Sequence, residues 1–149
     1  MKLAIGSDHA GFDLKEELRV VLHEWKHDTR DLGCSSKEPC DYPNVARDVA
    51  RAVAARQVDA GVLICSTGIG VSIAANRMPG IRAALCANCD MAYRARIHND
   101  ANILCLGARY TTLLDARAIL QVFLRSSFSG EERHCRRVAG LDAPVEKCA

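Results

Sequence analysis

The fold of this chain is decided by the stretch Ala60-Gly61-Val62-Leu63-Ile64-Cys65-Ser66-Thr67-Gly68-Ile69-Gly70. Its first six residues form a continuous apolar run, which is typical of a strand buried on both faces of a parallel sheet. The two glycines that follow predict a tight turn, and a helix is expected over 71–76. Strand, turn and helix in this order indicate an α/β fold, in which ligands bind at the carboxyl ends of the strands.

The same alternation continues along the rest of the chain. Apolar spacing of helical period predicts further helices, at 14–25, 45–55, 90–98 and 113–124. Apolar runs predict further strands, at 2–6, 29–32, 81–86 and 103–106. We therefore expect a single α/β domain over residues 1–149, with a mostly parallel five-stranded sheet and right-handed crossovers. Residues 126–149 are expected to form a polar C-terminal arm.

Composition excludes several classes of protein. Of the 149 residues, 49% are hydrophobic, so the chain can form a core and is not disordered. The 20 Lys and Arg nearly balance the 18 Asp and Glu, which argues against a generic nucleic-acid binder. No apolar run approaches the roughly 18 residues of a membrane span, and Met1–Asp8 lacks the apolar segment of a signal peptide. We expect a cytoplasmic protein that binds neither nucleic acid nor membranes.

Eight cysteines need an interpretation: Cys34, Cys40, Cys65, Cys86, Cys89, Cys105, Cys135 and Cys148. Because no export signal is present, we expect reduced thiols, with Cys148 free in the tail. The pair Cys86 and Cys89 is an isolated C-x-x-C motif, whereas a zinc site needs a second pair or suitably spaced histidines. No metal site is therefore expected.

The turn after the third strand is the sharpest local feature. Its glycines let backbone N–H groups converge, and the start of a helix adds partial positive charge, an arrangement that suits a phosphate or a developing oxyanion. Cys65 lies at its rim and could act as a base or nucleophile, beside Thr67. The alternative is an ordinary tight turn with a buried cysteine. Nucleotide-binding loops fit less well, because no Lys follows the glycines and Ile73 replaces the third glycine of the dinucleotide motif.

Polar residues also lie next to the other predicted strands. Asp8 and His9 could bind a sugar hydroxyl and a phosphate, or could cap a helix and face solvent. His98 and Asn99 could supply an acid or base and an orienting amide, or could cap a helix end. Four further candidates have basic side chains that suit a phosphate: Arg109, Arg133, His134 and Arg137. The last candidate is Tyr42, which could line a pocket or simply pack.

With these residues in view, the chain resembles the type B ribose-5-phosphate isomerase family, which also contains galactose-6-phosphate and allose-6-phosphate isomerases. The resemblance rests on segments in the family's order: 6–12, 41–43, 65–70, 72–76, 80–83, 96–102 and 130–137. It implies a Rossmann-like α/β/α fold and a homodimer, or a homotetramer, with active sites shared between subunits. It also implies cofactor-free interconversion of ribose 5-phosphate and ribulose 5-phosphate in the non-oxidative pentose phosphate pathway.

The resemblance also implies roles for individual residues. Cys65 would be the general base, with Thr67 and His98 assisting ring opening. The backbone of Gly68, Ile69 and Gly70, together with Asn99, would stabilise the enediolate. Ser66 stands where the family often has Gly, directly beside the base. Sugar hydroxyls would contact two residues, Asp8 and Tyr42. The phosphate would be held by five others: His9, Arg109, Arg133, His134 and Arg137.

Two alternatives to this function stay open from the sequence. A six-carbon sugar phosphate, such as allose 6-phosphate or galactose 6-phosphate, would use the same chemistry in a deeper pocket. A non-catalytic phosphosugar-binding module would need the glycine turn and the arginines, but neither Cys65 nor His98.

Overall fold

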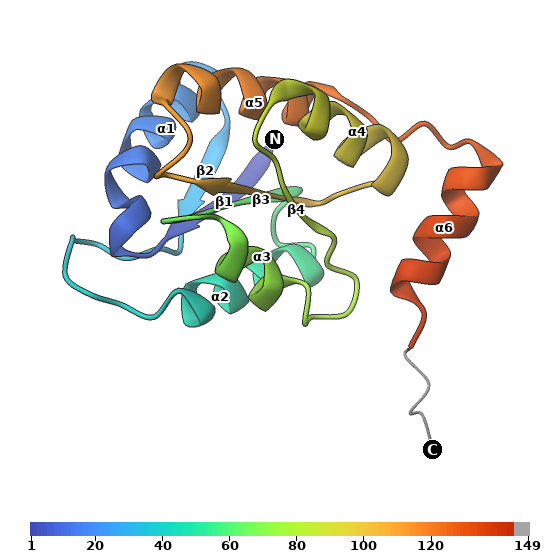
Figure 1. The fold of residues 1–149 in the computed structure, drawn as a ribbon, viewed down its shortest axis with the longest axis horizontal. Coiled ribbons are helices and arrows are strands. Elements are labelled where there is room, and N and C mark those ends of the chain that lie inside the picture. The colour runs from blue at the N-terminus through green and yellow to red at the C-terminus, as the bar shows by residue number, and fades with distance from the viewer. Residues whose placement is uncertain (145–149) are drawn as a thin grey trace.

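Five strands form one sheet in the computed structural model, which describes residues 1–144 (Figure 1). They are β1 (Lys2–Ser7), β2 (Asp28–Asp31), β3 (Ala60–Cys65), β4 (Ala83–Leu85) and β5 (Ile103–Gly107). Their order across the sheet is β2-β1-β3-β5-β4, and every pairing is parallel. The predicted Rossmann-like fold with a five-stranded sheet is confirmed, and the sheet is parallel throughout.

Helices cover both faces of the sheet, as Figure 1 shows. One apolar layer joins the sheet to α1 (Phe12–Glu24), α4 (Cys89–Asn99) and α5 (Leu113–Arg125). A second layer joins the opposite face to α2 (Tyr42–Ala54) and α3 (Ile69–Ala75). The central strand β3 is buried along its whole length, as its continuous apolar run predicts. No helix within residues 1–144 has the length and apolar character needed to cross a membrane.

Two predicted elements differ from the structure. The strand expected at 81–86 is shorter and spans Ala83–Leu85. On its open edge, the Asn76 side chain makes both backbone hydrogen bonds of Ala83, at 2.9 and 2.8 Å. The arm expected at 126–149 contains helix α6 (Glu132–Asp142), which packs beside α4 along the side of the body (Figure 1). Its last residue, Asp142, pairs with Arg82 at 2.8 Å. Only one side chain of α6, His134, is buried, and most residues of this helix are polar, so the segment resembles an exposed arm in sequence.

The expectation of reduced cysteines is wrong for one pair. Cys34 and Cys40 form a disulfide across the loop between β2 and α2. Sequence reasoning missed it because pairing depends on the path of this loop, which brings the two Cα atoms to 6.9 Å. The other described cysteines, Cys65, Cys86, Cys89, Cys105 and Cys135, are free thiols, and Cys148 lies outside the described residues.

The turn between β3 and α3 depends on Gly68. Its φ of 77° lies in the left-handed region, which residues with a side chain rarely adopt. A Cβ atom there would also lie 2.9 Å from the carbonyl carbon of Leu106 and 2.5 Å from the Leu85 side chain. The turn is therefore packed directly onto β5, and glycine is required both for its conformation and for its contact.

Gly68→Ala should destabilise the protein more than Gly80→Ala. Gly80 has nearly the same φ, 76°, but a Cβ atom there would meet nothing within 4 Å. The control should lose about 1 kcal/mol from backbone strain alone, and Gly68→Ala about 1–3 kcal/mol more from overpacking. Urea unfolding of both variants measures the difference, and equal losses would show that the contact with β5 contributes nothing.

Candidate active site

The thiol of Cys65 lies at the carboxyl end of the central strand, inside the glycine turn. Its Sγ accepts a hydrogen bond from the Gly68 N–H at 3.1 Å, and the residue is only 4% exposed. The Thr67 hydroxyl lies at the same turn and accepts the Ile69 N–H at 3.3 Å. The turn thus directs one backbone donor, the Gly68 N–H, toward the sulfur, where it can stabilise negative charge.

Three other segments converge on this turn. The Asp8 N–H donates to the Ile64 carbonyl at 3.3 Å, so the end of β1 lies directly beside the end of β3. The Arg109 N–H donates to the Ser66 carbonyl at 2.9 Å, which joins the end of β5 to the turn. Tyr42, at the start of α2, packs so closely on Gly70 that a Cβ atom there would lie 2.6 Å from its ring. The predicted convergence at the carboxyl edge of the sheet is confirmed for these residues.

The sequence left open whether Asp8 and His9 bind substrate or cap a helix and face solvent, and the two residues differ in this respect. Asp8 is 6% exposed, and its Oδ1 accepts the Gly11 N–H at 3.0 Å, so it caps the short 3-10 helix η1 (His9–Gly11). His9 is exposed at the rim, and its Nδ1 accepts the Cys40 N–H at 3.3 Å. The cap holds the backbone that presents His9.

His98 and Asn99 lie at the opposite edge of the sheet. Helix α4 follows β4 and runs back across the sheet, so its last residues lie near the amino ends of the strands. Two contacts fix this position: Arg82, just before β4, donates to the Asp100 carbonyl at 2.9 Å and accepts the Asn102 N–H at 3.0 Å. Edge to edge, β5 spans about 13 Å at the usual strand rise. One chain therefore does not bring His98 beside Cys65.

In the segment His98-Asn99-Asp100-Ala101-Asn102, some side chains hold the turn and others are free to contact a substrate. Asp100 has a φ of 45° and pairs with Arg82 at 2.9 Å. The Asn102 amide donates to the Gly80 carbonyl at 2.8 Å. Asp100 and Asn102 thus fix the turn at the end of α4, and the side chains of His98 and Asn99 remain at its surface.

Helix α6 places its polar residues beside His98. The ring of His134 lies 4.4 Å from the His98 ring, centre to centre, and its Nδ1 donates to the His98 carbonyl at 3.3 Å. His134 is only 3% exposed, so its contact with His98 is structural, and the phosphate role expected for it stays a prediction. Arg133 and Arg137 are exposed on the same helix, and Arg133 pairs with Glu131 at 2.8 Å.

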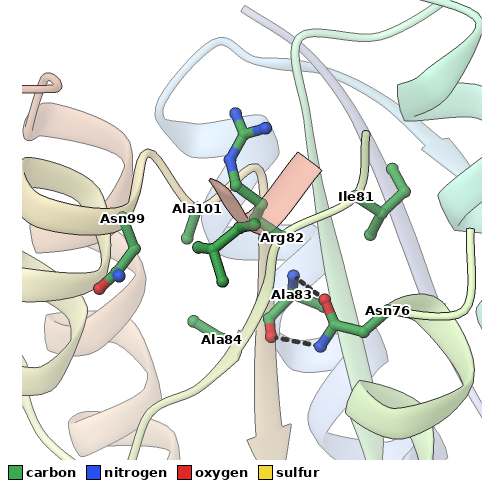
Figure 2. A pocket seen from close by; sticks show the side chains of 8 residues that line it. Asn76, Ile81, Arg82, Ala83, Ala84, Asn99 and Ala101 are labelled. Atoms are coloured by element: carbon green, nitrogen blue, oxygen red, sulfur yellow. Dashed lines mark hydrogen bonds between the residues drawn. The ribbon is translucent and has the colours of Figure 1, made fainter. Parts of the chain in front are cut away.

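A cavity of about 390 Å³ lies beside the edge strand β4. Figure 2 shows Asn99 on one side of it and Asn76 on the other. None of the residues that line it belongs to the group around Cys65. The cavity therefore contains only one part of the candidate site.

Two other internal thiols, Cys86 and Cys105, are poorly suited to act as bases. Burial raises the pKa of Cys86 to about 11, and burial raises the pKa of Cys105 well above its usual value. Neither thiol is a useful base near neutral pH. Within residues 1–144 no group of three or more His, Cys, Asp and Glu side chains is arranged to hold a metal ion.

His98 should titrate below the ordinary imidazole pKa of 6.5. Desolvation lowers its pKa most, and the positive charges of His134, Arg94 and Arg133 lower it further, while Glu131 opposes them. His98 is then neutral at pH 7 and able to accept a proton. NMR titration should show the pKa rising in Arg94→Gln and falling further in Glu131→Gln, because the first removes a positive charge and the second a negative one. A value above 6.5 in the unmodified protein would contradict this assignment.

Comparison with known proteins identifies the family of this chain. Residues 3–141 match the family model described as Ribose/Galactose Isomerase. The chain is 44% identical to ribose-5-phosphate isomerase B of Escherichia coli, over 95% of each chain. It is 40% identical, over 99% of each chain, to a Bacillus subtilis protein whose name gives only a general sugar phosphate isomerase activity. The structure of ribose-5-phosphate isomerase B from Clostridium thermocellum superposes with a TM-score of 0.94 at 46% identity, over 95% of each chain. This chain belongs to the Ribose/Galactose Isomerase family.

Proposed function

We propose that this protein interconverts D-ribose 5-phosphate and D-ribulose 5-phosphate, without a cofactor, in the non-oxidative pentose phosphate pathway. The observation that carries the proposal is the Cys65 sulfur, held by the Gly68 N–H at the carboxyl end of the central strand. The relatives named as ribose-5-phosphate isomerase B in Escherichia coli and Clostridium thermocellum support the choice of substrate.

The reaction moves one hydrogen from carbon 2 to carbon 1 of the open-chain sugar. The Cys65 thiolate removes the proton from carbon 2, and the electrons of that C–H bond form the double bond of an enediolate. The same sulfur then returns the proton to carbon 1, while a proton passes from the oxygen on carbon 2 to the oxygen on carbon 1. A single base that keeps the proton is sufficient for both transfers. Carbon 1 is reduced and carbon 2 is oxidised by the same amount, so the reaction consumes no external oxidant or reductant.

The remaining groups stabilise charge and position the substrate. Backbone donors of Gly68 to Gly70 and the Asn99 amide stabilise the enediolate oxygens, as an oxyanion hole does. Thr67 and His98 assist ring opening by moving the proton of the anomeric hydroxyl. Asp8 and Tyr42 contact sugar hydroxyls. The phosphate is held by five residues that lie at both edges of the sheet: His9, Arg109, Arg133, His134 and Arg137. Binding energy from this distant phosphate positions the reacting carbons.

The active site is built between two subunits. A single chain places Cys65 and His98 at opposite edges of the sheet, so a complete site requires the Cys65 edge of one subunit and the His98 edge of another. Two isoleucines on α3, Ile69 and Ile73, are 52% and 56% exposed on the same side of the helix, next to the Cys65 turn. An apolar surface beside an incomplete site is the kind of surface that a second subunit covers. The proposed assembly is a homodimer, or a homotetramer formed from such dimers.

Cys65→Ala should reduce isomerisation of ribose 5-phosphate by roughly 10² to 10⁴-fold, the range for loss of an acid–base group. The matched control is Cys86→Ala, which removes another buried thiol that the mechanism does not use and should keep most of the activity. Assays of both variants and the unmodified protein should include allose 6-phosphate. Turnover of the six-carbon sugar alone would overturn the pentose assignment, and turnover of neither sugar would favour a phosphosugar-binding module.

Mixing two inactive variants should restore activity if the site is shared. In a hybrid of Cys65→Ala and His98→Asn subunits, one of the two sites receives an intact Cys65 and an intact His98. Random pairing of equal amounts should recover about one quarter of the unmodified activity, because about half the dimers are hybrids with one working site each. The mixture is refolded or co-expressed and assayed with ribose 5-phosphate. If the mixture is no more active than the two variants assayed separately, the site is formed within one chain.

A further inference from the structure

The disulfide between Cys34 and Cys40 closes a short loop beside the proposed active site. The loop joins β2 to α2 and ends two residues before Tyr42. The residues between the two cysteines, 35–39, are exposed and contain no helix or strand. The cysteines themselves are half-buried. Apart from the disulfide, the loop is tied to α1 by one ion pair, between the exposed side chains of Lys37 and Asp13 at 2.8 Å. Exposed pairs of this kind contribute little to stability, so the covalent bond is the main constraint on the loop.

The Cys34 end of the loop is firmly anchored. The Cys34 N–H donates to the Ser7 carbonyl at the end of β1, at 2.9 Å. The Cys34 carbonyl accepts a hydrogen bond at 2.8 Å from Lys15, whose side chain is completely buried. Lys15 also pairs with Asp31 at 2.6 Å, and Asp31 accepts the Gly33 N–H at 2.9 Å. A buried and paired cation of this kind fixes the backbone that it contacts.

The Cys40 end of the loop contacts His9 directly. The Cys40 N–H donates to His9 Nδ1 at 3.3 Å. A nitrogen that accepts a hydrogen bond carries no proton, so this contact places the proton of the neutral ring on Nε2. His9 is exposed at the carboxyl edge of the sheet, where its Nε2–H can donate to an anionic oxygen. The disulfide therefore connects the rigid Lys15 anchor to the group that sets the tautomer of His9.

We infer that the Cys34–Cys40 disulfide is a reducible positioning element that holds His9 in its Nε2–H form and so strengthens phosphosugar binding. The inference rests on the proposed function for its substrate. Cys34 and Cys40 act through His9 and have no part in proton transfer. Their redox state should therefore change substrate affinity and leave the chemical step largely unaltered.

The redox step requires a dithiol as reductant. A thiolate of the dithiol attacks one sulfur of the pair, breaks the Cys34–Cys40 bond and forms a mixed disulfide. The second thiol of the reductant then closes its own ring and releases the remaining cysteine sulfur. The dithiol loses two electrons and two protons, and the protein gains two thiols. Both cysteines remain partly exposed to solvent, so a thiolate in solution can reach the disulfide bond.

The test compares the oxidised protein, the protein reduced by dithiothreitol, and the variant Cys34→Ser/Cys40→Ser. Alkylation under denaturing conditions confirms that reduction exposes two further cysteines. Reduction should raise the KM for ribose 5-phosphate about three- to tenfold with kcat changed less than about twofold, and the double variant should match the reduced protein. An equal KM in all three forms would overturn the inference.

Two controls exclude other thiols, Cys65 above all. The double variant should not respond to dithiothreitol, whereas Cys89→Ser, with the disulfide intact, should respond as the unmodified protein does. A response of the double variant equal to that of the unmodified protein would assign the effect to another cysteine and overturn the inference.

A spectroscopic readout separates this inference from the proposed function. Long-range ¹H–¹⁵N spectra should show His9 as the Nε2–H tautomer in the oxidised protein and as a mixture after reduction. If the protein turns over no sugar phosphate, the proposed function fails, and the His9 spectra still decide whether the disulfide sets the tautomer. An unchanged His9 spectrum after reduction would contradict it.

Discussion

The parallel pairing of β3 with β1 on one side and β5 on the other is the constraint on which the rest of the structure depends. Because the three strands run in the same direction, their carboxyl ends meet at one edge, and the residues that follow them meet as well. Ser7, Cys65 and Gly107 end these strands, and the segments after them form the surroundings of the thiol. The apolar run of β3 supports this arrangement because it is buried on both faces.

The same constraint separates the two parts of the candidate site. In a parallel sheet each helix returns the chain to the amino edge, so the end of α4 must lie away from the end of β3. The structure strengthens this separation with a polar cluster at the end of α4: Arg82 pairs with Asp100 at 2.9 Å and with Asp142 of α6 at 2.8 Å. These ion pairs fix His98 and its neighbour His134 as a preformed surface. This separation of Cys65 from His98 within one chain is the observation behind the proposed assembly of two subunits.

Backbone geometry contributes as much to the candidate site as side-chain chemistry does. The Cys65 sulfur accepts a hydrogen bond from the Gly68 N–H, and the left-handed conformation of Gly68 turns the chain from this peptide into α3. Gly107 allows the turn to approach β5, since a Cβ atom there would lie 2.6 Å from the Thr67 carbonyl oxygen. Asp8 acts in the same way when it caps η1. Several residues with expected roles in binding thus also hold the backbone that presents their neighbours.

The sequence by itself determined the order of strands and helices, the parallel sheet and the turn around Cys65, because hydrophobic period and glycine placement are local signals. It also placed Asp8, Tyr42, Cys65 and Arg109 at one edge, because the carboxyl ends of parallel strands must meet. Only the tertiary structure decided that His134 packs against His98, that Asp100 and Asn102 are structural, and that Cys34 pairs with Cys40. These features depend on contacts between residues that are distant in sequence or on the path of a loop without regular structure, and neither leaves a periodic pattern in the chain.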